Sequence, residues 1–173
     1  IGTSSGKVTD LYYAETDGTG YLPDIFYGRL SVENATHITT IVDKIIKYER
    51  ADLPSMADWF KKDAFLAGND NYSITEGTHN YCTSMFMDPH GYTTYKVYEQ
   101  TYGATTADVF TNVNAGRILT TMSGHGSDDG WYDGPQFTVT NVNQLTNGDR
   151  LTIATGHCCL ANNFGWTGGV CGG

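Results

Sequence analysis

Two short stretches of the sequence carry the residue types from which a nucleophilic active site is built. Residues 118–122 form an apolar run that leads into a Ser-Gly-His-Gly-Ser sequence containing His125, and residues 151–155 lead into a Gly-His-Cys-Cys sequence ending at Cys159. A cysteine thiolate attacks a carbonyl carbon when an imidazole shuttles the proton and N–H groups hold the developing oxyanion. The spacing of 34 residues between His125 and Cys159 fits one strand–helix–strand unit. The pattern indicates Cys–His chemistry, with a buried cysteine pair and a turn histidine as the structural alternative.

The elements that must position these residues alternate in type along the chain. Apolar runs that predict strands lie at residues 64–68, 94–98, 118–122 and 151–155, and polar segments of helix length lie between them at 76–88, 105–114 and 139–146. Such alternation is typical of an α/β fold in which a largely parallel sheet is covered by helices on both faces. Ligands bind at the carboxyl ends of the strands in these sheets. Both His125 and Cys159 directly follow predicted strands.

The first 50 residues contain two further predicted strands and one predicted helix. Residues 8–13 have a strand-like pattern, and the apolar run at 25–30 predicts a buried strand. The helix begins after Asn34, a residue type that caps helices, and ends near residues 49–50. Its apolar residues recur with helical spacing and predict one buried face: Ile38, Ile41, Val42, Ile45 and Ile46.

Composition excludes several classes of protein. The 173 residues include 19 acidic and 10 basic side chains, a net charge of −9, and 39% of them are hydrophobic. A chain of this length and apolarity has a core of its own and is not disordered. Its acidity argues against a nucleic-acid partner, and no apolar run approaches the ~20 residues that span a bilayer. Residues 1–6 lack the basic and apolar segments of a signal peptide, so we expect a mature protein or an excised piece.

A series of short motifs runs along nearly the whole chain. The upstream motifs are Val-Thr-Asp-Leu-Tyr-Tyr at 8–13, Asp-Gly at 17–18, Tyr-Leu-Pro-Asp at 21–24, Gly-Arg at 28–29, and Asp-Lys with Tyr-Glu at 43–49. The downstream motifs are Ser-Gly-His-Gly-Ser at 123–127 with Trp131, Leu-Thr-Asn at 145–147, Gly-His-Cys-Cys at 156–159, Asn-Phe at 163–164 and Cys-Gly-Gly at 171–173. In this series the sequence resembles the gingipains, secreted cysteine endopeptidases of Bacteroidetes with a caspase-like fold. The paired cysteines are closer to the lysine-specific member than to the arginine-specific members.

The resemblance implies a catalytic role for three residues. Cys159, the second of the paired cysteines, aligns with the family nucleophile, and Cys158 is its neighbour. His125 aligns with the general acid/base, and Asp70 aligns with the acid that orients this histidine. Asp70 follows the first core strand in an Ala-Gly-Asn-Asp sequence, so a helix cap or a turn residue is the structural alternative.

The resemblance also implies how a substrate is held. The backbone N–H groups of Gly126 and Cys159 would form the oxyanion hole, and Ser123 would belong with Gly126 to the residues that bind the oxyanion and the substrate. His157 departs from the family pattern, because the lysine-specific member has an asparagine there. Three further histidines have no partner spacing and are expected to be ordinary surface residues: His37, His79 and His90.

A turn near the N-terminus is a candidate metal site. Asp17 and Asp24 lie seven residues apart around a glycine-containing turn, and two carboxylates with backbone carbonyls between them suit Ca²⁺. The spacing does not match an EF-hand, so a plain surface turn is the alternative. The resemblance implies structural calcium held by both acids, with the backbone of Leu22 as a further ligand, and no cofactor for catalysis.

Compared with the gingipains, the chain begins partway into the usual domain and ends 14 residues after Cys159. We expect residues 1–50 to be the end of an N-terminal subdomain with the acidic loop and a linking helix. Residues 51–173 are expected to be a caspase-like, three-layer α/β/α catalytic subdomain, truncated after the nucleophile, with a sheet incomplete at both ends. The resemblance implies that a second chain or a missing segment completes the domain, and that the protein is secreted or lies at the cell surface.

The activity that these observations predict is hydrolysis of proteins or peptides by a Cys–His–Asp mechanism. The resemblance favours cleavage after lysine or arginine, with which the acidic chain is compatible. One alternative is a catalytically inactive gingipain-like binding or adhesion module. Another is a metal-binding protein whose ligands would be His125, His157, Cys158 and Cys171.

Overall fold

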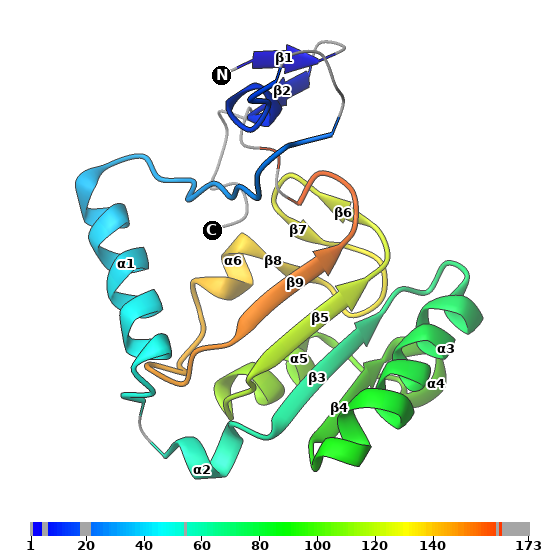
Figure 1. Ribbon diagram of the computed structural model, residues 1–173. Helices are drawn as coiled ribbons and strands as arrows, with labels where there is room; N and C mark the ends of the chain where they lie inside the picture. The colour runs from blue at the N-terminus through cyan, green and yellow to red at the C-terminus, as the bar shows by residue number, and fades with distance from the viewer. Residues whose placement is uncertain (1, 5–6, 18–21, 54, 162, 164–173) are drawn as a thin grey trace.

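A four-stranded parallel sheet forms the centre of the computed structural model, which describes residues 2–4, 7–17, 22–53, 55–161 and 163. Its strands lie in the order β4-β3-β5-β9, and all three pairings are parallel (Figure 1). The strands are β3 (Lys62–Ala67), β4 (Thr93–Tyr98), β5 (Leu119–Ser123) and β9 (Ile153–His157). The α/β fold and the four core strands predicted from the sequence are confirmed.

The three helices predicted between these strands are present, but their bounds differ, and a further short helix that was not predicted follows β4 at residues 99–102. The helical elements are α1 (Ala35–Glu49), α2 (Met56–Trp59), α3 (Tyr72–Cys82), a π-helical turn (Thr83–Met87), a 3₁₀ turn (Asp88–His90), α4 (Glu99–Tyr102), α5 (Thr106–Asn114) and α6 (Val139–Val142). The helix predicted at 76–88 begins earlier and ends in π and 3₁₀ turns. The helix predicted at 139–146 stops at Val142. α5 begins at a capping box, in which Thr105 and Asp108 each accept the other's backbone N–H.

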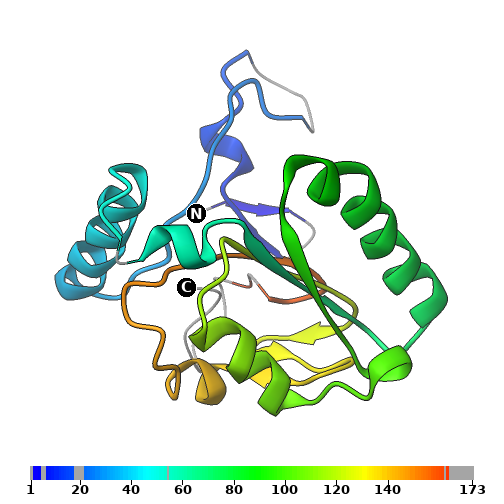
Figure 2. The same cartoon turned by 90° about the horizontal axis from the view of Figure 1, so that it is seen from below.

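Apolar side chains cover both faces of the sheet. β3 is buried over its last five residues, as is typical of a central parallel strand. Its side chains alternate between the faces: Ala64 and Leu66 belong to a cluster with Val109 of α5, whereas Phe65 and Ala67 belong to a cluster that reaches the end of α3. Figure 2 shows α3 and α5 on opposite sides of the sheet. The predicted three-layer arrangement is therefore confirmed.

A small antiparallel sheet follows β5 and lies against the carboxyl ends of the parallel strands. It consists of β6 (Gly126–Ser127), β7 (Gly130–Trp131) and β8 (Phe137–Thr138). The hairpin between β7 and β8 contains Gly134, which has a positive φ of 85° and lies against the carbonyl oxygen of Ala67 at the end of β3. A side chain at position 134 would collide with that carbonyl. The hairpin is thus held beside the loop that leaves β3.

The predictions for residues 8–30 are partly wrong. β2 (Lys7–Thr9) pairs with β1 (Gly2–Ser4), but the chain then turns into a 3₁₀ helix, Leu11–Tyr13, instead of extending the strand to residue 13. Residues 25–30 form no strand, and Phe26 is fully exposed. An apolar run shows only that side chains can be buried, whereas a strand also needs a partner. Among the described residues no strand pairs with this segment, which an Arg29–Asp10 ion pair fastens instead.

α1 confirms the predicted helix but not its predicted burial. The Asn34 side chain caps it by accepting the backbone N–H of His37 at 3.0 Å. Four of the five residues on the predicted buried face are exposed, from 38% at Val42 to 47% at Ile38, and Ile41 is half-buried. Tyr48 and Ile45 of α1 border a groove of about 670 Å³ that also touches Ile153 of β9, the edge strand on this side of the described sheet. The predicted domain boundary at residue 50 stays a prediction.

Candidate functional site

The parallel register brings three loops to one edge of the sheet. Ala67 of β3 pairs with Ser123 of β5, and Ser123 pairs with His157 of β9. His125 and Cys159 therefore each lie two residues beyond aligned strand ends, and Asp70 lies three beyond. We call the residues that follow these strands (68–70, 124–126 and 158–159) the carboxyl edge. The sheet thus gathers the three residues to which the sequence assigned catalysis.

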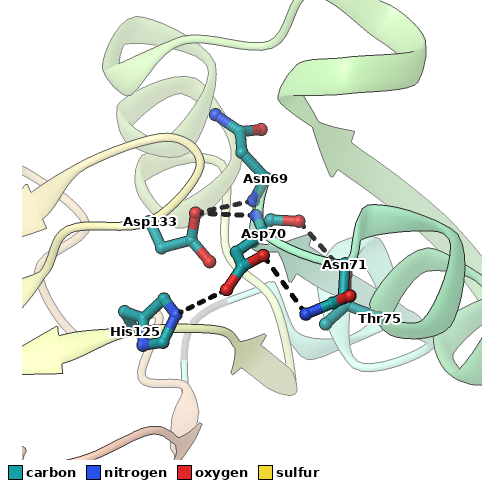
Figure 3. Close-up of polar contacts among 7 residues, drawn as sticks. Asn69, Asp70, Asn71, Thr75, His125 and Asp133 are labelled. Carbon is teal, nitrogen blue, oxygen red and sulfur yellow. Dashed lines mark hydrogen bonds and ion pairs between the residues drawn. The ribbon is translucent and has the colours of Figure 1, made fainter.

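Asp70 and His125 contact each other directly. Nε2 of His125 lies 3.2 Å from Oδ2 of Asp70, and the two side chains are 65% and 64% exposed (Figure 3). An exposed ion pair of this kind contributes little to folding stability. A carboxylate on one ring nitrogen does, however, orient the imidazole and stabilise its protonated form. Because Nε2 faces the carboxylate, Nδ1 is the ring nitrogen left to exchange a proton with a thiol.

The two neighbouring cysteines have different surroundings. Cys159 is exposed, whereas Cys158 is half-buried and packs against the apolar cluster on the α5 face. Burial raises the pKa of the Cys158 thiol, with Cys159 as a smaller cause. A thiol with a raised pKa forms less thiolate and is a poorer nucleophile at neutral pH. Of the two, Cys159 is the thiol that a substrate can reach.

Gly126 lies against both cysteines. A Cβ built on Gly126 would lie 2.7 Å from the Cys159 carbonyl oxygen and 2.8 Å from Sγ of Cys158, closer than real side chains approach. Glycine is therefore required at this position for the loop after β5 to pack against the loop after β9. This close approach brings the backbone of the residue that follows His125 to the backbone of Cys159. The N–H groups assigned to an oxyanion hole belong to these two segments.

Ser123 faces a residue that the sequence analysis placed wrongly. Its hydroxyl is 2.8 Å from Nε2 of His79 on α3. His79 is not a surface residue, as predicted, but is only 3% exposed and stacks on Phe65 with ring centroids 4.9 Å apart. Glu76, His79 and Thr83 lie on one buried helical face. All three are polar, so their spacing gives no apolar pattern that would predict this burial from the sequence. The substrate-binding role of Ser123 stays a prediction.

The burial of His79 makes stability depend on pH. Desolvation lowers the pKa of His79 from 6.5 to about 4, with His157 as a smaller cause. Between these values the unfolded chain binds a proton that the folded protein excludes, so the free energy of unfolding falls as the pH drops from 6.5 towards 4. Relative to acidic pH below 4, the neutral His79 side chain adds about 3 kcal/mol to the free energy of unfolding, and this amount is fully present above pH 6.5.

We therefore expect His79→Gln to flatten the pH dependence of the melting temperature between pH 4 and 6.5, measured by thermal unfolding of the full-length protein. The matched variant His90→Gln, which removes an exposed histidine, should leave that dependence unchanged. An equal pH dependence in wild type and His79→Gln would contradict a neutral, buried imidazole.

Asp133 is a second residue that the sequence analysis missed. Its Oδ1 accepts the backbone N–H groups of Asn69 at 2.7 Å and of Asp70 at 3.2 Å, although the two segments are far apart in the sequence. Asp133 lies in a Trp-Tyr-Asp-Gly-Pro sequence at 131–135. Aspartate before Gly-Pro is typical of any turn, so nothing in the sequence distinguishes it.

The acidic turn near the N-terminus is only partly described. Oδ2 of Asp24 accepts the backbone N–H groups of Thr16 at 2.6 Å and Asp17 at 3.2 Å, and these bonds lower the pKa of the Asp24 carboxyl. Leu22 is exposed, and residues 18–21 lie outside the described residues. The described part of the turn offers two carboxylates, one of them already bonded to N–H groups, against the six to eight oxygens that Ca²⁺ takes. It does not by itself make a calcium cage.

The alternative of a metal-binding protein gains no support from the described residues. Among them, no three His, Cys, Asp or Glu side chains are grouped to hold a metal ion, and Cys171 lies outside them. Nor does that part of the chain contain a helix with the length and apolarity needed to cross a bilayer.

The sheet and its carboxyl edge define a caspase-like α/β protein in which a thiol, an imidazole and a carboxylate share one edge. The family model of peptidase family C25 matches residues 2–173. The chain belongs to peptidase family C25.

Individual relatives agree with this assignment. The chain is 34% identical over 167 residues to Lys-gingipain of Porphyromonas gingivalis, covering 94% of the chain and 9% of that relative. A solved structure described as a protease superposes with a TM-score of 0.86 at 30% identity, covering 99% of the chain and 37% of the other. The Arg-specific cysteine proteinase gingipain R superposes with a TM-score of 0.79 at 25% identity, covering 96% and 39%. The predicted gingipain resemblance is confirmed, and the chain spans well under half the length of each of these proteins.

Proposed function

We propose that this chain carries the catalytic edge of a secreted or cell-surface cysteine endopeptidase that cleaves proteins after lysine or arginine. The observation that carries the proposal is the exposed Cys159 thiol on the same sheet edge as the Asp70–His125 pair. Membership of peptidase family C25 supports the class of reaction. The protein substrates and the location are inferred from the relatives.

In the proposed mechanism, His125 takes the thiol proton as Cys159 attacks the scissile carbonyl carbon. The C–N bond then breaks, His125 gives its proton to the leaving amine, and a thioester remains on Cys159. His125 next removes a proton from water, which attacks the thioester; the product acid leaves and the thiol is restored. Asp70 keeps the imidazole in one orientation throughout. No step passes through a metal.

The oxyanion of both tetrahedral intermediates needs hydrogen-bond donors that are already in place. We assign this role to the backbone N–H groups of Gly126 and Cys159. The close packing of these two segments supports the assignment, because it leaves no room for a side chain between them. Backbone donors held in this way need no rearrangement as charge develops.

The preference for a basic residue rests on the relatives and on charge. Two of them carry lysine or arginine specificity in their names, and the net charge of −9 is compatible with a cationic substrate. Structural calcium at Asp17 and Asp24 is proposed on the same resemblance, with further ligands from outside the described residues.

Labelling with lysyl and arginyl chloromethylketones tests both parts of the proposal in the full-length protein. These reagents alkylate an active-site thiol only after their basic side chain has bound. We expect intact-mass and peptide mapping to find one adduct, on Cys159, and none in a Cys159→Ala variant. If iodoacetamide labels Cys159 but neither basic reagent does, the basic preference is wrong. If a panel of peptidyl chloromethylketones with other side chains also fails, the chain belongs to an inactive binding module.

A further inference from the structure

The loop that carries Asp70 is fastened to its surroundings at successive residues. The Gly68 N–H donates to the carbonyl of Ser123 at 2.7 Å, and the Gly68 carbonyl accepts the Thr75 hydroxyl at 3.1 Å. Asn71 donates its side-chain N–H to Oδ1 of Asp70 at 3.2 Å and has a positive φ of 53°. A non-glycine residue keeps such a conformation only where its neighbours hold it. The loop is therefore specified closely, although Asp70 itself is exposed.

Asp133 supplies the bonds at the centre of this loop. Its Oδ1 accepts the N–H of Asn69 at 2.7 Å and of Asp70 at 3.2 Å, as Figure 3 shows. A carboxylate that accepts two N–H groups makes stronger hydrogen bonds than a neutral acceptor. These bonds fix the backbone from which the Asp70 side chain extends towards His125.

The other carboxylate oxygen of Asp133 lies between the two loops that carry the ion pair. Oδ2 is buried and has no hydrogen-bond donor among the described residues. A Cβ on Gly68 would overlap this oxygen, and a Cβ on Gly124 would come within 3.0 Å of it. Gly68 directly follows β3 and lies two residues before Asp70, and Gly124 directly precedes His125. Glycines at both places make room for one carboxylate between the two loops.

A side chain that only secured the β7–β8 hairpin would not need this position. The hairpin already has its own contacts, including the ladder between β7 and β8 and a bond from the Tyr132 hydroxyl to Asp129 at 2.9 Å. Burying a carboxylate oxygen without a hydrogen-bond donor costs folding free energy. Asp133 has such an oxygen at the place where its other oxygen binds the backbone of the Asp70 loop. The hydrogen bonds of Asp133 therefore indicate a role in positioning Asp70 for its contact with His125, and not in securing the hairpin.

We propose that Asp133 is a positioning residue, whose carboxylate fixes the backbone of Asp70 and thereby the carboxylate that orients His125. This inference deepens the proposed function and rests on it for its kinetic consequence. A displacement of about 1 Å at a catalytic group can reduce turnover about 100-fold. Asp133 is expected to act on kcat and not on substrate binding, because it touches the Asp70 loop and not the exposed face of the site.

The test compares Asp133→Ala and Asp133→Asn with Tyr132→Phe, a matched variant that removes a hairpin hydrogen bond away from the Asp70 loop. In the full-length protein we expect Asp133→Ala to lower kcat by about 10- to 100-fold, with KM within about twofold of wild type. Asp133→Asn keeps an acceptor oxygen and should restore most of the loss. Tyr132→Phe should leave kcat unchanged.

A double variant decides whether Asp133 acts through Asp70. If it does, Asp133→Ala adds no further loss of kcat in an Asp70→Ala background, because the two residues work as one unit. Losses that multiply would overturn the proposal. So would an Asp133→Asn variant as impaired as Asp133→Ala at an equal melting temperature.

Hydrogen–deuterium exchange tests the role of Asp133 in the Asp70 loop without any measurement of activity. In Asp133→Ala, the amides in a peptide spanning residues 68–72 should lose protection, whereas Asp133→Asn and Tyr132→Phe should retain it. If wild type cleaves no peptide but this pattern of exchange holds, the proposed function fails and Asp133 still fixes the loop. Unchanged protection in Asp133→Ala would show that the carboxylate does not hold the Asp70 backbone.

Discussion

Cys159→Ala is expected to abolish peptide hydrolysis by the full-length protein, with a fall in kcat of roughly 10⁴-fold or more. The loss is this large because the thiol forms the covalent bond to the substrate, and no other described thiol is as exposed at the carboxyl edge. Release of a fluorescent leaving group from a lysyl or arginyl peptide measures it. Substrate binding should survive, because the alanine removes only the sulfur atom.

Cys158→Ala is the matched control, since it removes the same atom from the adjacent residue. We expect it to retain most of the activity and to lose some stability, because the Cys158 thiol packs against the apolar cluster on the α5 face. A kcat reduced equally in both variants would mean that the wrong nucleophile has been chosen or that the two thiols act as a unit. Alkylation of the remaining cysteine in each variant would separate these two results.

His125→Ala is expected to produce the second-largest effect, a fall in kcat of about 10²- to 10⁴-fold. The imidazole moves a proton in both halves of the proposed reaction, so its loss slows formation and breakdown of the thioester. Asp70→Asn should cost less than His125→Ala, because it removes the orienting charge and leaves the base in place. Stopped-flow measurement of the first turnover and of the steady state with an ester and an amide substrate checks this order.

His157→Asn is the control for the His125→Ala and Asp70→Asn variants, because it removes a second imidazole near the carboxyl edge. We expect its activity to stay within a few-fold of wild type. A larger loss in His157→Asn than in His125→Ala would contradict the assignment of the general base. An Asp70→Asn variant with unchanged kcat would show that the 3.2 Å contact between Asp70 and His125 has no role in turnover.

The core of the fold could be predicted from the sequence because its central strands, β3 and β5, are largely buried. A continuous apolar run such as that of β3 stands out against polar helices, and the alternation of the two element types implies a parallel sheet. The run at 25–30 shows the limit of this reasoning. Its composition matches that of a strand, but pairing depends on a distant segment that local sequence does not specify.

The residues of the candidate site also fall into two groups, those that the sequence could place and those that it could not. Cys159 and His125 could be placed because each follows a core strand, and parallel strands end at a common edge. His79 and Asp133 could not, since their roles depend on which partner they meet in space. A helix histidine becomes buried only because Phe65 and Ser123 lie beneath it. A turn aspartate meets the Asp70 backbone only because the β7–β8 hairpin folds over the end of β3.

Synthesis from the N-terminus delivers the parts of the carboxyl edge in a fixed order. β3 pairs with β5, and β5 with β9, through contacts such as Asp63 with Leu119 and Leu119 with Ile153, so no part of the edge forms from a single local segment. Asp70 leaves the ribosome first, His125 second and Cys159 last. On the proposed mechanism, a nascent chain holds the carboxylate and the imidazole before it has any thiol beside them. A nascent chain that stops short of Cys159 therefore lacks the nucleophile of the proposed reaction.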